Sequence, residues 1–107
     1  MNWTVEFLNA DVKSALFALP MDMRARFERI AHLMEEHGIS AMREPYVKHL
    51  EGPLWEMRLQ GREGIARAAY VTVSERRVVV VHVFVKKAQK TPRREIEMAL
   101  RKAKEIR

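Results

Sequence analysis

The stretch from Val78 to Val85 constrains the fold most, because every residue in it except His82 is apolar. Valine and phenylalanine favour strands, and a strand that is apolar on both faces belongs in the interior of a sheet. The run is also far shorter than the roughly 20 residues that a helix needs to cross a bilayer. The sequence therefore predicts a central strand that the rest of the chain must cover.

Two neighbouring segments predict the partners of this strand. Leu54 to Leu59 alternates apolar residues with Glu56 and Arg58, and the turn Gln60 to Gly64 leads into a returning strand over Ile65 to Val73. A further turn, Ser74 to Arg77, then leads into the central strand. The three strands form an antiparallel meander.

The N-terminal third predicts one more strand and a helical hairpin. Trp3 to Phe7 alternates with a period of two, as in a half-buried edge strand that opens the fold. The hairpin spans Ala10 to His37, with Asn9 as the cap of its first helix, Pro20 between the helices and Gly38 after the second. The apolar stripes of the two helices are Val12, Ala15, Leu16 and Leu19, then Met23, Phe27, Ile30, Ala31 and Met34.

The remaining segments predict a loop and a final helix. Residues Ile39 to Pro53 show no sustained period and are predicted to be a loop. Thr91 is expected to cap a C-terminal helix with Pro92 at its first position. Its inner stripe consists of Ile96, Ala99, Leu100, Ala103 and Ile106. The 107 residues thus predict one α+β domain, spanning 1–107, with the order β-α-α-β-β-β-α and a small, mostly antiparallel sheet.

Positive charge is concentrated in the C-terminal two-thirds of the chain. Residues 1–37 hold 4 basic and 6 acidic side chains, whereas residues 38–107 hold 16 basic and 8 acidic. Such asymmetry favours a polyanionic partner, because neutralising phosphates releases condensed counterions. The alternative at this stage is a solvated basic surface that keeps a small protein soluble.

Several chemistries are excluded or disfavoured. The chain has no cysteine, so thiol nucleophiles, disulfides and thiolate metal sites are excluded, which suits the reducing cytoplasm. His32 and His37 are five residues apart, which turns them to different sides of a helix and disfavours a metal site. The four glycines match no phosphate-binding loop. We therefore expect neither a metal nor a cofactor.

The remaining candidate site is a set of cations on the predicted sheet. If the Gln60 to Gly64 turn forms, Arg58 and Arg67 lie opposite each other and share a face, with Lys86 and Lys87 after the central strand. Two like charges across strands favour a shared anion, although either arginine could instead reach solvent or pair with Glu56. Tyr70, Trp55 and Phe84 are either base-stacking surfaces or core, and His82 is either a buried strand histidine or a catalyst.

Three segments, in order, resemble one protein family. They are Lys48 to Arg58 (KHLEGPLWEMR), Arg67 to Tyr70 (RAAY) and Val83 to Pro92 (VFVKKAQKTP). They are similar to the phage-derived branch of the RelE/HigB-type toxins of bacterial toxin–antitoxin modules. The resemblance implies a RelE-like fold and a ribosome-dependent endoribonuclease that cuts messenger RNA in the ribosomal A site through the RNA 2′-hydroxyl, without a metal.

The resemblance also implies roles for particular residues. Arg67 corresponds to the arginine of the third strand and would hold the scissile phosphate from a partly exposed position, so that alanine would remove activity and leave the fold intact. The other implied catalytic residues are Arg58, Lys86, Lys87 and His49, and the implied RNA-binding residues are Lys48, Tyr70, Lys90, Arg93 and Arg94. Several relatives have a tyrosine or histidine after the central strand that acts as a general acid or base, and here none follows Val85. His49, the only histidine in the basic loop, is the substitute for that role.

The resemblance implies that the protein is cytoplasmic, does not associate with a membrane and has an antitoxin partner. In this family the antitoxin is typically a helix-turn-helix DNA-binding protein. Two alternatives fit the same basic sheet. One is a non-catalytic RNA- or DNA-binding module, and the other is a degenerate toxin that acts only through its antitoxin.

Overall fold

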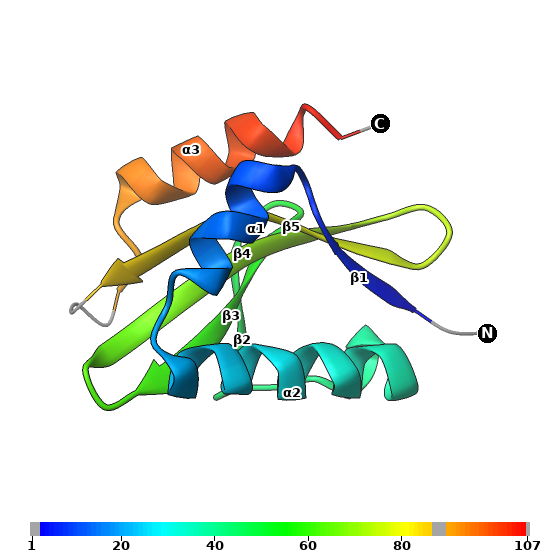
Figure 1. The fold of residues 1–107 in the computed structure, drawn as a ribbon. Helices are drawn as coiled ribbons and strands as arrows, with labels where there is room; N and C mark the ends of the chain where they lie inside the picture. Colours follow the sequence, from blue (N-terminus) through cyan, green and yellow to red (C-terminus); the bar gives the residue numbers. More distant parts are fainter. Residues whose placement is uncertain (1–2, 87–89, 107) are drawn as a thin grey trace.

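The computed structural model of the chain describes residues 3–86 and 90–106, and these form one mixed sheet covered by helices (Figure 1). The strands are β1 (Thr4–Phe7), β2 (Val47–Glu51), β3 (Leu54–Gly61), β4 (Gly64–Val73) and β5 (Arg77–Lys86). The helices are α1 (Ala10–Phe17), α2 (Met21–His37), the short 3-10 helix η1 (Ile39–Ala41) and α3 (Arg93–Ala103). The strand order is β1-β5-β4-β3-β2, with only β1 and β5 parallel. This confirms the predicted α+β class.

The predicted meander is present as β3, β4 and β5. β5 has strand partners on both edges, β1 and β4, as its apolar sequence predicts, and β4 is the middle strand of the sheet. The β3–β4 register pairs Arg58 with Arg67, which confirms that the two arginines lie opposite each other. β1 is an edge strand, and Glu6 accepts hydrogen bonds from the Arg77 guanidinium of β5 at 2.8 and 3.1 Å.

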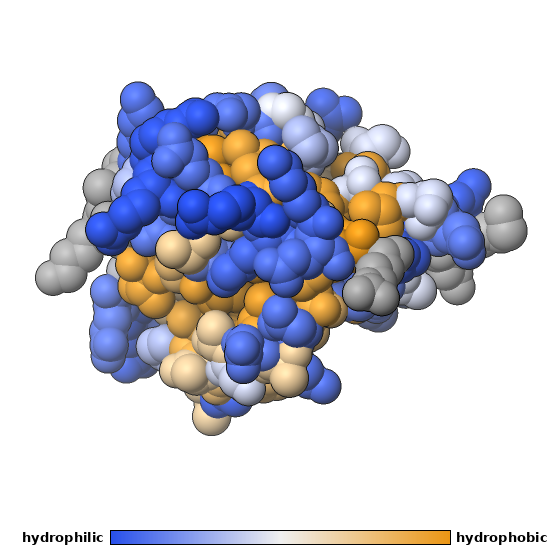
Figure 2. All heavy atoms as spheres, turned by 90° about the horizontal axis from the view of Figure 1, so that it is seen from above, coloured by the Kyte–Doolittle hydropathy of each residue, from blue (hydrophilic) through white to orange (hydrophobic). Residues whose placement is uncertain are grey.

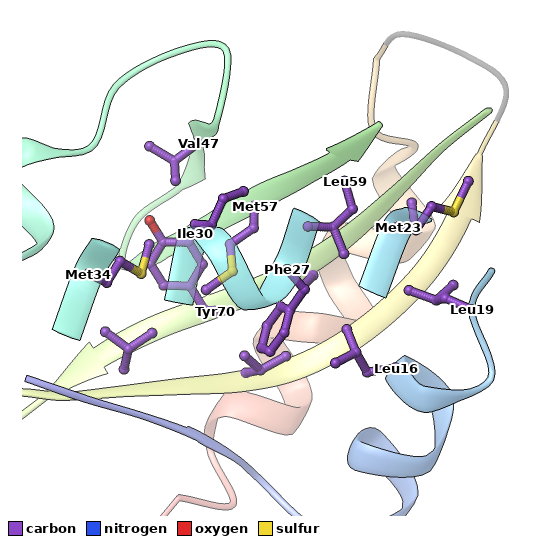
Figure 3. Packing of buried hydrophobic residues seen from close by; sticks show 14 of the residues in the cluster. Leu16, Leu19, Met23, Phe27, Ile30, Met34, Val47, Met57, Leu59 and Tyr70 are labelled. Atoms are coloured by element: carbon purple, nitrogen blue, oxygen red, sulfur yellow. The ribbon is translucent and has the colours of Figure 1, made fainter. Parts of the chain in front are cut away.

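The helices cover both faces of the sheet, and α2 and α3 lie on opposite sides (Figure 1). Helices α1 and α2 bury their predicted stripes, including Leu16, Phe27 and Ile30, against one face, which we name the α2 face (Figure 3). Helix α3 packs Ala99 against Leu54, Val71, Val79 and Val81 on the other face, which we name the α3 face. None of the helices in the described part of the chain is long and apolar enough to cross a membrane.

Two of the predicted helix ends are confirmed in detail. The Asn9 side chain accepts a hydrogen bond from the Val12 backbone N–H at 2.9 Å, which satisfies one of the unpaired donors at the start of α1. Gly38 follows α2 with a φ of 83° and donates its backbone N–H to the Met34 carbonyl. A positive φ here favours glycine, as expected for the residue after a helix.

The predicted loop over Ile39 to Pro53 is wrong in part, because it contains η1 and the additional strand β2. Strand β2 pairs with β3 through the tight turn at Gly52 and Pro53. It is a short edge strand whose register shifts between His49 and Glu51, so its residues show no regular alternation. The order therefore has one more strand than predicted, and Lys48 and His49 lie on a strand.

The predicted cap of α3 is also wrong. Pro92 occupies the N-cap position, and no side chain caps the helix. The Thr91 hydroxyl instead donates a hydrogen bond to Oε1 of Glu56 at 2.7 Å. A buried carboxylate requires hydrogen-bond donors, so the Thr91 hydroxyl binds Glu56 and does not cap the helix.

A one-residue bulge in β5 redirects the end of that strand. Ala69 of β4 pairs with His82, whereas Tyr70 pairs with Val80, so Val81 is the additional residue. Val81 and His82 both lie on the α3 face, where Val81 packs in the apolar cluster and His82 contacts Glu95 of α3. The bulge thus places His82 beneath the first turn of α3.

We expect Gly61→Ala to lower the free energy of unfolding by about 1–3 kcal/mol. A Cβ at Gly61 would lie 2.8 Å from Cγ of Met23 and from Oδ1 of Asp22, at the start of α2. Asp22 cannot move away freely, because its other oxygen accepts the Arg62 backbone N–H at 2.8 Å. Chemical denaturation measures the change, and Glu63→Ala, at an exposed position of the same turn, should stay within about 0.5 kcal/mol of wild type. Equal stabilities of the two variants would contradict this packing.

Candidate functional site

Three cations lie on the α3 face, near the segment that leads into α3. Arg58 and Arg67 are cross-strand partners on β3 and β4, and Lys48 of β2 is the partner of Glu56. Because residues two apart on a strand share a face, Glu56, Arg58, Arg67 and Lys48 all belong to the α3 face. In the view from this side of the molecule, hydrophilic residues lie over a hydrophobic layer (Figure 2).

Arg67 is not on a partly exposed surface, so that expectation is wrong. Its side chain is 0% exposed, and its Nε lies 3.3 Å from Oε2 of Glu56, which is 1% exposed. Burial is the main cause that lowers the pKa of the Arg67 guanidinium, the Glu56 carboxylate opposes this, and the positive charge of Arg58 lowers the pKa further. Of the alternatives that the sequence left open, pairing with Glu56 is therefore correct.

Glu56 and Thr91 are part of this arrangement, although the sequence suggested Glu56 only as an alternative partner of the arginines and Thr91 only as a helix cap. The alternation of β3 predicts an exposed Glu56, but its side chain is buried, and Thr91, just before α3, donates a hydrogen bond to it. The available signal is the row across the sheet that pairs Glu56 with Ala69, a small residue that leaves room for neighbouring long side chains. That row becomes visible only once the strand register is known.

Arg58 is the half-buried cation above this buried pair. Its backbone N–H donates to the Tyr46 carbonyl at 2.8 Å, which holds β3 against the segment before β2. Its Nε is buried and has no hydrogen-bond partner among the described residues. No carboxylate among the described residues pairs with this half-buried guanidinium, so it remains a cation that is suited to bind an incoming anion.

His82 is a buried strand histidine with two partners on α3. Nζ of Lys102 lies 3.1 Å from Nδ1 of His82, and an ammonium group can only donate, so Nδ1 is the acceptor. The proton of the neutral ring is then on Nε2, which donates to Oε1 of Glu95 at 2.7 Å. Phe84 stacks on the His82 ring at 5.2 Å between centroids. These contacts make His82 part of the attachment of α3 to the sheet.

The structure separates His49 and Tyr70 from the arginines. His49 lies opposite Trp55 on β3, with ring centroids 5.0 Å apart, and both belong to the α2 face. Its Nε2 is 2.8 Å from the Gly52 carbonyl oxygen. Tyr70 is 3% exposed and packs among the α2 residues of the core (Figure 3), so it offers no surface for base stacking. Trp55 is 38% exposed, also on the α2 face.

The predicted cations after β5 are only partly placed. The backbone of Lys86 ends β5 opposite Ile65, whereas Lys87 lies outside the described residues. Lys90 and Arg94 are exposed. Arg93 is exposed but engaged, because its guanidinium binds both oxygens of Glu51 on β2 and its Nε donates to Glu97 at 3.2 Å.

The Arg93 contacts attach the start of α3 to β2. Hydrogen bonds with Glu51, and then with Glu97, raise the pKa of Arg93, and the same contact lowers the pKa of the Glu51 carboxyl. Both groups stay charged near neutral pH. Arg93 is therefore less available for an external phosphate than Lys48 or Arg58.

This face can bind and stabilise negative charge. It offers the cations Lys48 and Arg58 at the surface, supported from below by a neutralised Arg67–Glu56 pair. Within residues 3–86 and 90–106, no group of three or more histidine, aspartate or glutamate side chains is placed to hold a metal ion.

Two solved structures share this arrangement of sheet and helices. A chain from the archaeal RelE–RelB complex of Pyrococcus horikoshii is 23% identical and aligns over 84% of this chain and 100% of its own length, with a TM-score of 0.60. The E. coli toxin RelE, in the free state of a double arginine-to-alanine mutant, is 19% identical over 94% of this chain and 97% of its own, with a TM-score of 0.65. The fold is therefore that of the RelE toxins.

The sequence itself identifies the family. Residues 14–104 match the model of the phage-derived protein Gp49-like family, and the chain belongs to that family. This confirms the phage-derived, RelE-type resemblance that the segments around Lys48, Arg67 and Val83 indicated. No curated protein matches the chain in sequence.

Proposed function

We propose that the chain is the toxin of a toxin–antitoxin pair and cleaves messenger RNA on the ribosome. The observation that carries the proposal is the RelE-like fold, which extends over 94% of this chain and 97% of the E. coli toxin. The basic C-terminal two-thirds and the cations of the α3 face support an RNA substrate.

In the proposed reaction the RNA supplies its own nucleophile. The 2′-hydroxyl loses its proton and its oxygen forms a bond to the adjacent phosphorus, while the bond from phosphorus to the 5′-oxygen breaks and that oxygen gains a proton. The products are a 2′,3′-cyclic phosphate and a 5′-hydroxyl. The protein orients the RNA and stabilises the charge on the phosphate and the leaving oxygen. Cations are able to provide both effects without a metal.

The proposed roles of Arg58, Arg67, His49 and Tyr70 follow their positions, whereas those of Lys86 and Lys87 rest on the family resemblance. Arg58 contacts the scissile phosphate, and Lys86 and Lys87 neutralise or protonate the leaving oxygen. Lys48, Lys90 and Arg94 are the proposed RNA-binding cations, and Arg93 has a secondary part because it is engaged with Glu51. Arg67 is a positioning residue, because it is buried against Glu56 and supports β3 beneath Arg58. His49 and Tyr70 have no role in this proposal, because they lie on the opposite face or in the core.

The proposed partner is an antitoxin that covers the basic α3 face while the toxin is inactive. The archaeal RelE structure is a complex with RelB, which supports a partner of this kind. We propose a cytoplasmic complex with a helix-turn-helix antitoxin encoded in the same host. Co-purification of the tagged chain from that host, followed by mass spectrometry, should recover one small protein in stoichiometric amount, and recovery of the chain alone would contradict this proposal.

Induced expression in bacteria, with sequencing of transcript 5′ ends, tests the activity. We expect growth arrest together with new 5′ ends inside translated codons. Transcripts that are not translated should show no new ends. Normal growth together with salt-sensitive RNA binding would support the non-catalytic binding module instead. Normal growth without RNA binding would support a degenerate toxin that acts only through its antitoxin.

A further inference from the structure

A small cavity lies at the free edge of β3, next to the proposed catalytic face. Strand β2 pairs with β3 only as far as Met57, so the β3 residues after Arg58 have no partner on that side among the described strands. The cavity has a volume of about 240 Å³ and is lined by Arg26, Pro45, Arg58, Gln60 and Ile65. It therefore combines a residue of α2 with residues of the exposed end of β3.

The charge of this cavity is positive. Two of its five lining side chains are guanidinium groups, and none is a carboxylate. Arg26 lies over the ring of Tyr46, with its Cζ 6.0 Å from the ring centroid, and this contact holds the guanidinium without neutralising it. Arg58 contributes a half-buried guanidinium that has no carboxylate partner in the described part of the chain. Two guanidinium groups that line one small cavity favour a shared anion.

We propose that Arg26 and Arg58, with the amide of Gln60, bind one phosphodiester group of an RNA strand in this cavity. The inference rests on the proposed function, because it takes RNA as the ligand of the basic face. The volume is below the range of about 300–1,000 Å³ typical of pockets for small organic ligands, and it suits a phosphate better than a nucleoside. Arginine is also the side chain whose planar fork matches phosphate oxygens.

The position of the cavity favours RNA over an isolated small anion. Arg58 is shared between the cavity and the row of cations that includes Lys48, and the backbone of Lys86 lies opposite Ile65, which lines the cavity. A strand whose scissile phosphate lies on the Lys48 side of Arg58 would thus continue around the β3 edge, and its neighbouring phosphate would bind in the cavity between Arg58 and Arg26. Arg26 is then an RNA contact on α2, a helix outside the basic two-thirds of the sequence.

The test measures binding of a 2′-O-methyl oligoribonucleotide, which cannot be cleaved through its 2′-oxygen. We expect Arg26→Gln to weaken binding about 5- to 20-fold at 50 mM salt and to lower the slope of log affinity against log salt by about 0.7, the value for one phosphate contact on a single strand. Arg26→Lys should keep the slope and recover part of the affinity, because it keeps the charge and loses the fork.

The matched control is Arg29→Gln, which makes the same charge change at an exposed position one turn further along α2. It should bind the oligonucleotide with the affinity and slope of wild type. Thermal unfolding checks that all three variants are folded. Equal losses for Arg26→Gln and Arg29→Gln would show a general charge effect and would overturn the site.

Two other results would also overturn the proposal. One is that Arg26→Gln binds the oligonucleotide as tightly as wild type. If that variant also loses its co-purifying antitoxin, the cavity binds a carboxylate of the partner instead of RNA. The other is no binding of the oligonucleotide by wild type at 50 mM salt. The test is independent of cleavage, so a chain that binds RNA through Arg26 but never cuts it would contradict the nuclease and leave the phosphate site in place.

Discussion

Arg67→Ala is expected to lower the free energy of unfolding by about 3–5 kcal/mol, because it leaves the buried Glu56 carboxylate without its counter-charge. Arg67 is 0% exposed and Glu56 1%, so water cannot replace the lost partner without opening the contact between α3 and the sheet. Chemical denaturation followed by circular dichroism measures the change. A toxin assay of this variant would report loss of folded protein before it reported anything about catalysis.

The double variant Glu56→Gln/Arg67→Met tests whether the unpaired Glu56 carboxylate causes the loss of stability. Its uncharged side chains remove both buried charges, and the Gln oxygen still accepts the Thr91 hydroxyl, so most of the lost stability should return. Arg62→Ala, at an exposed position of the β3–β4 turn, serves as the control for loss of one arginine. If Arg67→Ala unfolds like Arg62→Ala, within about 0.5 kcal/mol of wild type, Arg67 is not the buried half of an ion pair.

Arg58→Ala is expected to slow RNA cleavage by a factor of about 10²–10³, because it removes the cation proposed to face the developing charge on the phosphate. Its effect on stability should be small, since Arg58 is only half-buried and has no ion-pair partner among the described residues. Arg58→Lys should restore part of the rate, because a point charge replaces a planar fork. Single-turnover cleavage rates at equal concentrations of folded protein provide the measurement.

Arg62→Ala is the matched control for this prediction. Arg62 lies in the turn that follows β3, is exposed, and contributes its backbone N–H to the fold through Asp22. Its loss changes the net charge by the same amount as Arg58→Ala but leaves the α3 face intact. Equal rates for Arg58→Ala and wild type would remove Arg58 from the catalytic site.

The sequence predicted the parts of the fold that follow from local periodicity. The apolar run in β5, the alternation of β3 and the stripe from Met23 to Met34 each identified an element and its buried side. The pairing of Arg58 with Arg67 followed from the length of the turn between their strands. β2 was missed because a short edge strand with a register shift has no regular alternation.

The candidate site was less predictable, because it depends on contacts between distant segments. Burial of Arg67 requires Thr91 and the start of α3 to cover Glu56, 35 residues away from Thr91 along the chain. The face on which His49 lies depends on the register of β2, which the sequence did not reveal. Arg26 gave no signal at all, because it lies beside the apolar stripe of α2 like any polar helix residue.

The proposed cleavage of messenger RNA on the ribosome can be measured with purified components. The folded wild-type protein is added to ribosomes programmed with an mRNA whose A-site codon is defined, with a parallel mRNA carrying a 2′-O-methyl group at each A-site nucleotide. We expect cleavage within the A-site codon of the first mRNA, with 2′,3′-cyclic phosphate and 5′-hydroxyl ends, and none within the modified codon. Intact mRNA in both reactions would show that the protein is not a ribosome-dependent nuclease, and equal cleavage of both would show that the RNA 2′-hydroxyl is not the nucleophile.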